Sequence, residues 1–328
     1  MKTIEELNDA IRAFQASRVL LTGIELDVFQ AVGAGATSAE VAQLARTDPR
    51  ATGVLLDALA ALGLLSKQGD VYHNTEVAAR HLTAGSPEDA RGAFMHTTHL
   101  WQRWSSLTQS VRTGRPAQPP EEGEGPGAED ARTRAFISAM HRNALERAPH
   151  VMQVVDLDGV RRMLDLGGGS GAYSIVFAQA NPGLRSELLD LASVLPLTRA
   201  YVQAAGLADR VAARPGDIAQ ESYGSGYDLV WISQICHMFG ESENRAMLRK
   251  AHAALERGGR VVIQDFILDP DRTSPPHAAL FAINMLVGTT RGTAYTEAEY
   301  AAWLADAGFC GVRRIPLPGP SDLIVARR

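Results

Sequence analysis

The sequence predicts an α/β protein, with a doubly wound, mostly parallel sheet in its second half and a mainly helical first half. From residue 160 onward, short apolar runs alternate with helical patterns, and the first run leads into the glycine loop "LGGGSG". Residues 1–100 instead show apolar spacings of three and four, which are typical of amphipathic helices. We therefore expect domains at 1–100 and 156–328, joined by linking helices and a pocket segment at 101–155.

The composition is that of an ordinary globular protein. The chain has 328 residues, of which 45% are hydrophobic and 21% charged, and its net charge is −5. This weak acidic excess argues against binding to nucleic acid, which needs a basic face. Two cysteines are too few for a disulfide framework or a zinc cluster. The apolar stretches are too short to span a membrane, and the N-terminus has no signal-peptide core, so we expect a cytoplasmic protein.

The first 100 residues have the outline of a winged helix. Helical spacing at the start is followed by a capping box in "TSAEVAQLA", a helix start at Asp48-Pro49 and a hairpin pattern in "LLSKQGDVYHN". A winged helix that reads DNA presents basic side chains from its second helix. Here that helix continues after Arg50 as "ATGVLLDALAALGLL", which is nearly all apolar. This pattern favours a packing or dimerisation role.

The middle segment contains a helix, a linker and a second helix. The first, "RGAFMHTTHLWQRWSSLTQSVR", carries two histidines and two tryptophans, which suit either the core or a pocket wall. Two histidines without further ligands do not make a metal site. The Pro-, Gly- and Glu-rich residues 113–130 are typical of a surface linker, and helical character returns at Arg132.

The second half predicts five parallel strands, alternating with helices. A final pair of strands, separated by a Pro-Gly-Pro turn, must be antiparallel because the connection is too short for a parallel crossover. The expected strands cover residues 160–167, 186–191, 210–217, 227–234 and 260–268, then 312–318 and 321–328. One of the intervening helices is expected over 242–259, where Gly258 and Gly259 would end it.

The glycine loop after the first strand indicates a nucleotide-type ligand. Glycines at 167, 169 and 171 allow a tight turn and a close approach of the backbone to a ligand. Gly167, Gly169 and Ala172 also satisfy the dinucleotide fingerprint, so the glycines alone leave a nicotinamide cofactor open.

Three acids narrow the choice of ligand. Asp165, Asp190 and Asp217 lie near the carboxyl ends of three successive strands, the edge at which open α/β sheets bind ligands. A carboxylate in the position of Asp190 can bind both hydroxyls of a ribose. Each acid could also be a helix cap or a solvated loop residue, but their common placement favours a shared site.

Taken in order, these features resemble the S-adenosylmethionine-dependent O-methyltransferases of the plant caffeic acid and acetylserotonin type. The matching features are the winged-helix start, "LDLGGGSG", the acid after the second strand, "PGD", "ICH" and the closing hairpin. The resemblance covers the whole chain. It implies a Rossmann-like class I methyltransferase sheet with an antiparallel last strand, the cofactor S-adenosylmethionine and a small, aromatic acceptor. It also implies a homodimer formed through the N-terminal domain.

The resemblance assigns roles to individual residues. Gly167 and Gly169 would line the methionine part of the cofactor above Asp165, and Asp190 would hold the ribose. The remaining cofactor residues it implies are Asp217 and Ile218 at the adenine, and Ser233 and Gln234 beside the cofactor. His237 falls on the catalytic histidine of the family.

A histidine suits this chemistry, although a lone histidine near apolar residues is more often structural. A phenol with a pKa near 10 is mostly protonated at neutral pH, and an imidazole can take its proton as the methyl group arrives, without a metal. Asp265 matches the acid that orients the histidine in the family. A second family acid is Ala294 here, and the acid after the histidine is Met238. These departures leave C- or N-methyl transfer, or a changed reaction, as alternatives.

The acceptor pocket is expected to draw on three segments. The resemblance places Met140 and His141 over the cofactor, and Phe281, Asn284 and Met285 on the substrate helix, with Trp101 as a further wall residue. Phe281 and Met285 could equally be core residues. Asn284 is a polar residue in an apolar helix and therefore needs a hydrogen-bond partner. Two less favoured functions are a winged-helix regulator that binds DNA and a nicotinamide-dependent oxidoreductase.

Overall fold

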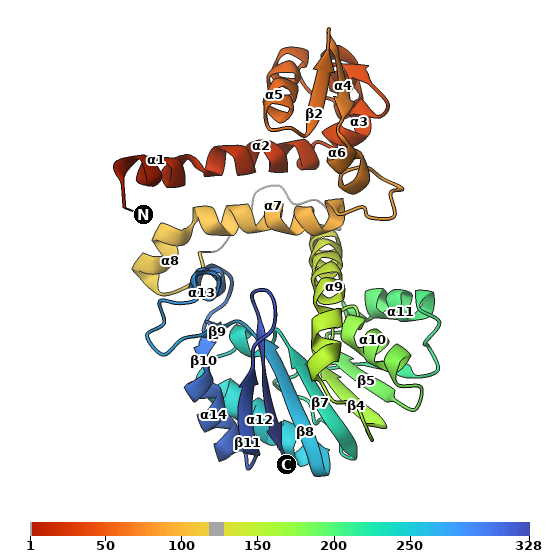
Figure 1. Ribbon diagram of the computed structural model, residues 1–328, viewed down its shortest axis with the longest axis vertical. Helices are drawn as coiled ribbons and strands as arrows, with labels where there is room; N and C mark the ends of the chain where they lie inside the picture. Colours follow the sequence, from red (N-terminus) through yellow and green to blue (C-terminus); the bar gives the residue numbers. More distant parts are fainter. Residues whose placement is uncertain (1, 118–127) are drawn as a thin grey trace. The chain divides into compact units, whose positions relative to one another are not determined.

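The computed structural model describes residues 2–117 and 128–328 (Figure 1). The chain divides into two compact units, Met1–Trp101 and Gln102–Arg328. Residues 118–127, in the middle of the Pro-, Gly- and Glu-rich linker, lie outside the described residues. Whether this loop closes over a site therefore also lies outside the description. In the described part of the chain, no helix is both long and apolar enough to cross a membrane.

The first unit is mainly helical and carries the expected hairpin. Its elements are α1 (Ile4–Arg12), α2 (Phe14–Glu25), α3 (Val28–Val32), β1 (Ala36–Thr37), α4 (Ser38–Ala45), α5 (Pro49–Ala61), β2 (Leu65–Gln68), β3 (Val71–Asn74) and α6 (Glu76–His81). The capping box at Thr37 and Glu40 and the N-cap at Asp48 are confirmed. The short strand β1, which the sequence did not predict, joins the hairpin in the order β1-β3-β2.

The apolar second helix of the winged-helix outline packs into the core of its own unit. Leu56 and Leu59 of α5 are fully buried beside Phe29. Burial accounts for the apolar residues on this face and agrees with the expected packing role, whereas Val54 of the same helix is 62% exposed.

The second unit contains the predicted doubly wound sheet. Its strands are β4 (Arg162–Leu166), β5 (Arg185–Asp190), β6 (Val211–Pro215), β7 (Tyr227–Ser233), β8 (Leu255–Asp265), β11 (Cys310–Ile315) and β12 (Asp322–Arg327). They lie in the order β11-β12-β8-β7-β4-β5-β6. β4 to β8 are parallel, whereas β12 is antiparallel to both β8 and β11, as the short turn required.

Helices cover both faces of this sheet (Figure 1). One face packs against α9 (Ala128–Val154), α10 (Ala172–Ala180) and α11 (Leu195–Ala204). The other packs against α12 (Glu241–Ala254) and α14 (Glu297–Asp306). The remaining elements are α7 (Arg91–Ser105), α8 (Leu107–Thr113), the 3-10 turn Cys236–Met238, β9 (Ile267–Leu268), α13 (Pro276–Gly288) and β10 (Tyr295–Thr296).

Two boundaries differ from the sequence predictions. The helix expected over 91–112 is divided into α7 and α8 at Ser106. The helix expected over 242–259 ends already at Ala254, and β8 begins at Leu255. Leu255 is buried and pairs with Tyr227 of β7, so strand pairing extends β8 through the two glycines that were expected to stop the helix.

Candidate active site

The carboxyl ends of the parallel strands bring three loops together around Gly167. Gly167 and Gly169 have φ angles of +65° and +57°, a left-handed conformation that favours glycine. A Cβ atom on Gly167 would lie 2.3 Å from Cδ1 of Ile235 and 3.2 Å from Cδ1 of Ile218. The loops after β4, β6 and β7 therefore meet here, and a larger residue would push them apart.

Asp190 ends β5 beside this glycine loop. Its Oδ2 accepts a hydrogen bond from the backbone N–H of Gly169 at 2.8 Å, and its Oδ1 accepts one from the N–H of Leu191 at 2.7 Å. Burial raises the pKa of Asp190, while the two N–H groups act in the opposite direction. Each carboxylate oxygen keeps acceptor capacity for a further hydroxyl group.

Asp165 lies beneath the loop and is almost completely buried. Ser174 of α10 donates its hydroxyl to Oδ2 of Asp165 at 2.6 Å, and among the described residues Oδ1 has no hydrogen-bond partner. Burial raises the pKa of Asp165 to about 7. This acid supports the loop from inside the protein, and burial favours its protonated form.

We expect Asp165→Asn to change how stability depends on pH. The folded protein keeps Asp165 protonated up to about pH 7, whereas an unfolded chain ionises an aspartate near pH 4. The folded state thus binds more protons between these values, and the contribution of Asp165 to stability is complete below about pH 4 and lost as the pH rises to about 7. Urea unfolding from pH 4 to 8 should show the variant gaining up to about 4 kcal/mol over the wild type. Parallel stability curves would contradict the expectation.

The other predicted cofactor residues lie on neighbouring loops. Asp217 is exposed after β6, and its Oδ1 accepts a hydrogen bond from the N–H of Ala219 at 2.8 Å. Ser233 ends β7 and donates its hydroxyl to Oε1 of Gln264 at 2.9 Å. Gln234 has a φ of +58°, so the chain leaves β7 in a left-handed turn towards His237.

His237 and Asp265 form a buried pair at the same edge of the sheet. Nδ1 of His237 lies 2.6 Å from Oδ1 of Asp265, and the His237 side chain is 7% exposed. Asp265 ends β8, while His237 lies in the 3-10 turn after β7. These strands are neighbours, and this arrangement brings together two residues 28 positions apart.

Four hydrogen bonds hold the Asp265 carboxylate. Besides the imidazole, the backbone N–H groups of Phe266 and His237 donate to it at 2.9 and 3.2 Å. The hydroxyl of Tyr300 on α14 donates to Oδ2 at 3.0 Å. Burial first, and the neighbouring Asp265 second, raise the pKa of Tyr300 well above its usual range, which keeps the hydroxyl protonated as a donor. Nothing in the sequence pattern distinguishes Tyr300 from an ordinary core residue of an amphipathic helix, so it was not predicted as a site residue.

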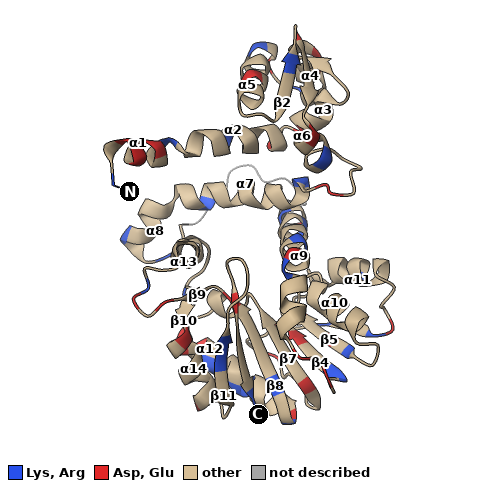
Figure 2. Ribbon diagram, in the orientation of Figure 1, with Lys and Arg blue, Asp and Glu red and all other residues tan. Residues whose placement is uncertain are grey.

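An aromatic wall lies against the His237 ring. Phe281 of α13 meets the imidazole edge-on with a centroid distance of 4.7 Å, and it stacks on Phe266 at 3.8 Å. Met285 is buried on the same helix, which carries no charged side chain (Figure 2). Asn284 has the hydrogen-bond partner that its polarity predicted: the indole N–H of Trp104 donates to its Oδ1 at 3.0 Å.

One of the expected pocket residues, His141, lies beside the glycine loop. His141 lies 2.8 Å (Nδ1) from the hydroxyl of Ser170 and stacks on Tyr201 at 3.9 Å, and burial lowers its pKa. Met140 precedes it on α9 and is half-buried. Trp101 belongs to the first compact unit, where the guanidinium of Arg18 lies 5.7 Å from its ring.

The two departures from the family pattern have different surroundings. Ala294 is buried and packs in an apolar cluster that includes Phe266 and Ala278, so an apolar group occupies this place. Met238 is 46% exposed at the edge of the 3-10 turn. Asp265 is thus the acid that contacts His237 among the described residues.

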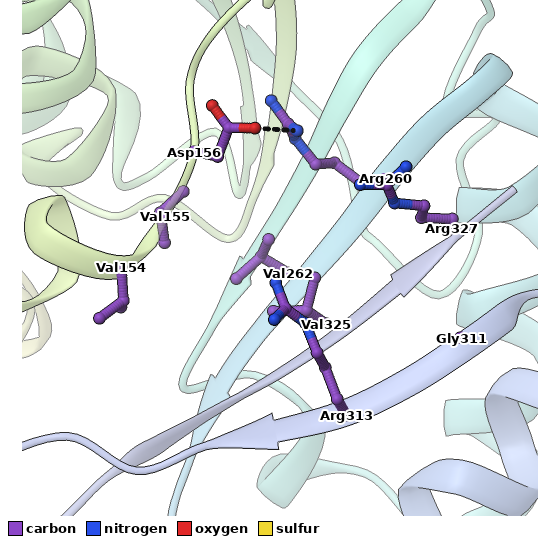
Figure 3. A pocket seen from close by; sticks show the side chains of 9 residues that line it. All are labelled: Val154, Val155, Asp156, Arg260, Val262, Gly311, Arg313, Val325 and Arg327. Carbon is purple, nitrogen blue, oxygen red and sulfur yellow. Dashed lines mark hydrogen bonds and ion pairs between the residues drawn. The ribbon is translucent and has the colours of Figure 1, made fainter.

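A separate surface pocket lies away from these residues (Figure 3). Val262 and Val325 form its floor, and Arg260, Arg313 and Arg327 surround it, with Arg260 paired to Asp156 at 3.1 Å. Arg260 precedes Asp265 by five residues on β8, or roughly 17 Å of extended chain. The pocket therefore lies towards the opposite end of the strands from His237.

Comparisons with known proteins identify the family of the chain. A family model described as an O-methyltransferase domain matches residues 104–310, and one described as an O-methyltransferase dimerisation domain matches residues 8–84. A 3-hydroxy-5-methyl-1-naphthoate 3-O-methyltransferase of Streptomyces sahachiroi is 36% identical over 96% of this chain and 92% of its own. An L-tyrosine C(3)-methyltransferase of Streptomyces lavendulae is 34% identical over 60% of this chain and 55% of its own.

A solved structure agrees over the whole length. Human N-acetylserotonin methyltransferase in complex with S-adenosylmethionine has a TM-score of 0.85 and 26% identity, with 100% of this chain and 98% of that chain covered. The matched domains, the relatives and the fold point to the same conclusion. The chain is an enzyme of the S-adenosylmethionine-dependent O-methyltransferase family.

Proposed function

We propose that this enzyme transfers a methyl group from S-adenosylmethionine to a hydroxyl group of a small aromatic metabolite, with His237 as the general base and without a metal ion. The observation that carries the proposal is the buried His237–Asp265 pair beside the Phe281–Phe266 wall. Apolar walls with a few convergent polar groups suit a small aromatic ligand.

The hydrogen bonds of Asp265 support the role of His237. Because Nδ1 of His237 faces the carboxylate, it carries the proton, and Nε2 is the nitrogen with the free lone pair. That nitrogen can accept the proton of an aromatic hydroxyl. The backbone N–H of His237 is bound to the same carboxylate, which fixes both the main chain and the ring.

The residues at the glycine loop fit the cofactor. Bound S-adenosylmethionine supplies an activated methyl group. Gly167 and Gly169 leave room for the backbone to approach its methionine part, and Asp190 retains acceptor capacity for two ribose hydroxyls. Asp217 and Ile218 would meet the adenine, and Ser233 and Gln234 would flank the cofactor. The general base and the glycine loop lie at one edge of the sheet, as an in-line transfer requires.

A C-methyltransferase is the alternative. The L-tyrosine C(3)-methyltransferase among the relatives acts on a ring carbon beside a phenol. A base that removes the phenol proton would also activate that carbon, so the His237 site suits both reactions. Product analysis separates them, because an O-methyl ether has lost the phenol hydroxyl and a C-methyl product retains it.

We also propose that the enzyme is a homodimer formed through its first unit. α1 exposes Ile4, Leu7 and Ile11, and no residue of this helix is buried. An apolar helix face of this kind needs a partner surface, and the dimerisation domain of the family covers residues 8–84.

Calorimetric titration with S-adenosylmethionine, and separately with NAD, tests the proposed function. We expect binding of S-adenosylmethionine and none of NAD, followed by methyl transfer to members of a panel of phenols. Folded protein that binds NAD and not S-adenosylmethionine would point to an oxidoreductase instead. DNA binding with a steep salt dependence would support a regulator.

Tyr300→Phe is expected to lower kcat about tenfold with little change in KM. The variant removes the hydroxyl that holds Oδ2 of Asp265, and with it a hydrogen bond to a charged group, which stabilises by about 1.5–3 kcal/mol. Loss of part of this energy loosens the orientation of the imidazole. Tyr295→Phe is the matched control, because the Tyr295 hydroxyl binds the carbonyl of Phe239 and not Asp265. Equal kcat losses in both variants would indicate a purely structural role.

A further inference from the structure

Arg147 lies beside the same aromatic wall that contacts His237. This arginine projects from α9, and its guanidinium carbon is 5.9 Å from the centroid of the Phe266 ring. Phe266 stacks on Phe281, which in turn meets the His237 imidazole. The His237 ring also lies 6.2 Å from the Phe266 ring, so the base and the guanidinium both border the aromatic pair against which a flat ligand would bind.

A chain of hydrogen bonds connects the same guanidinium to the end of β7. Nη1 of Arg147 donates to the hydroxyl of Ser321 at 3.4 Å, and the side-chain amide of Gln264 donates to that hydroxyl at 3.2 Å. Gln264 accepts a hydrogen bond from Ser233, one of the residues expected beside the cofactor. Arg147 is thus linked to the aromatic wall beside His237 on one side and, through Ser321 and Gln264, to Ser233 at the end of β7.

Among the described residues no carboxylate forms an ion pair with Arg147, although Glu146 favours its charged form from farther away. A guanidinium has five N–H donors. In residues 2–117 and 128–328 it makes the one long hydrogen bond to Ser321 and no ion pair with a carboxylate. Two other half-buried arginines of this unit are paired with acids, Arg214 with Glu187 and Arg314 with Asp322, and Arg210 donates to three backbone carbonyls.

The lack of an ion-pair partner for Arg147 is energetically costly. The side chain is half-buried, and burial lowers the pKa of Arg147, which means that its charged form is poorly solvated. A partly buried cation without an anion is unfavourable unless a ligand supplies the missing charge.

We propose that Arg147 is the carboxylate-binding residue of the active-site pocket. The inference rests on the proposed function, because it takes this pocket to hold the acceptor and the cofactor. The planar guanidinium matches a carboxylate in two parallel hydrogen bonds. That carboxylate belongs either to an aromatic hydroxy acid bound along the Phe266–Phe281 wall or to the methionine end of the cofactor.

Binding measurements on two matched ligand pairs distinguish these sources. The first pair is S-adenosylhomocysteine and 5′-methylthioadenosine, which lacks the amino acid end. The second pair is 3-hydroxy-1-naphthoate and 2-naphthol, which lacks the carboxylate. Each ligand is titrated into wild type, Arg147→Gln and Arg147→Lys by calorimetry. Arg142→Gln is the control variant, because Arg142 is on the same helix but is paired with Glu146 on the surface.

We expect Arg147→Gln to weaken binding of a carboxylate ligand about 10- to 100-fold and to spare its carboxylate-free counterpart. Arg147→Lys keeps the charge but loses the planar pair of N–H donors. Its Kd for a carboxylate ligand should therefore lie between those of wild type and Arg147→Gln. If only the affinity for 3-hydroxy-1-naphthoate falls, the carboxylate belongs to the acceptor. If only the affinity for S-adenosylhomocysteine falls, it belongs to the cofactor.

Two results would overturn the inference. One is that Arg147→Gln binds both carboxylate ligands as tightly as wild type does. The other is that Arg147→Gln loses the same affinity for both members of each pair, which would indicate a packing role. Melting temperatures of all variants show whether the fold is intact. If wild type binds neither nucleoside, the proposed function fails, and the naphthoate pair still decides the role of Arg147.

Discussion

Replacing His237 by asparagine is expected to lower kcat for methyl transfer by about 10²- to 10⁴-fold, the usual contribution of a general base. Asparagine keeps a polar group of similar size that can still donate to Asp265, but it cannot take a proton from a phenol. The pair is buried, so solvent has little access to replace the missing base. The Kd for S-adenosylmethionine should stay within about twofold, because the glycine loop and Asp190 are untouched.

Rapid-quench measurements of a single turnover with a phenol acceptor provide the test, since they separate the chemical step from product release. His252→Asn is the matched control, a half-buried histidine on α12 that packs on Phe309 away from the site. A His237 variant that retains full single-turnover activity would rule out general-base catalysis by this residue. A variant that no longer binds the cofactor would instead indicate a structural role for the His237–Asp265 pair.

Asp190→Ala is expected to raise the Kd for S-adenosylmethionine by about 10²- to 10⁴-fold. A carboxylate that binds two ribose hydroxyls contributes two hydrogen bonds to a charged acceptor, each of about 1.5–3 kcal/mol. The variant also removes the acceptor for the N–H of Gly169, which positions the glycine loop. Both losses act on cofactor binding, and the effect on kcat at saturating cofactor should be much smaller.

Calorimetric titration measures this effect directly. Asp190→Asn preserves the shape and one acceptor oxygen, so its Kd should lie between those of wild type and the alanine variant. Asp209→Ala, an exposed acid before the first residue of β6 and at the opposite end of that strand, should bind like wild type. Unchanged binding by Asp190→Ala would show that the ribose is held elsewhere.

Local sequence patterns were enough to predict most of the fold. Alternation of apolar strands with helices gave the parallel sheet, and the short Pro-Gly-Pro connection gave the antiparallel last pair. The pattern was wrong at 255–259, because the two glycines normally end a helix, whereas pairing of Leu255 with Tyr227 extends β8 through them. Tertiary pairing of this kind leaves no local signal.

In the candidate site, too, some residues could be predicted from the sequence and others could not. Strand ends can be located in the sequence, so Asp190 was expected at the carboxyl edge of the sheet, where the structure has it. His237 and Asp265 were identified by the family resemblance, and their roles stay predictions. Tyr300 and Arg147 were missed, because each has the expected pattern of its own helix and gains its role only from distant residues. Asn284 is an intermediate case, since its polarity predicted a partner but not that the partner is Trp104, 180 positions away.

The position of β12 has a consequence for synthesis on the ribosome. β12 lies between β8 and β11, yet it comes last of the three in the chain. Until residue 327 has been made, β8 is an edge strand whose apolar run Val261–Ile263 has no neighbour on that side. Open edges of this kind pair readily with other chains. The nascent catalytic unit therefore passes through a stage prone to aggregation, which ends only when β12 inserts and closes the sheet.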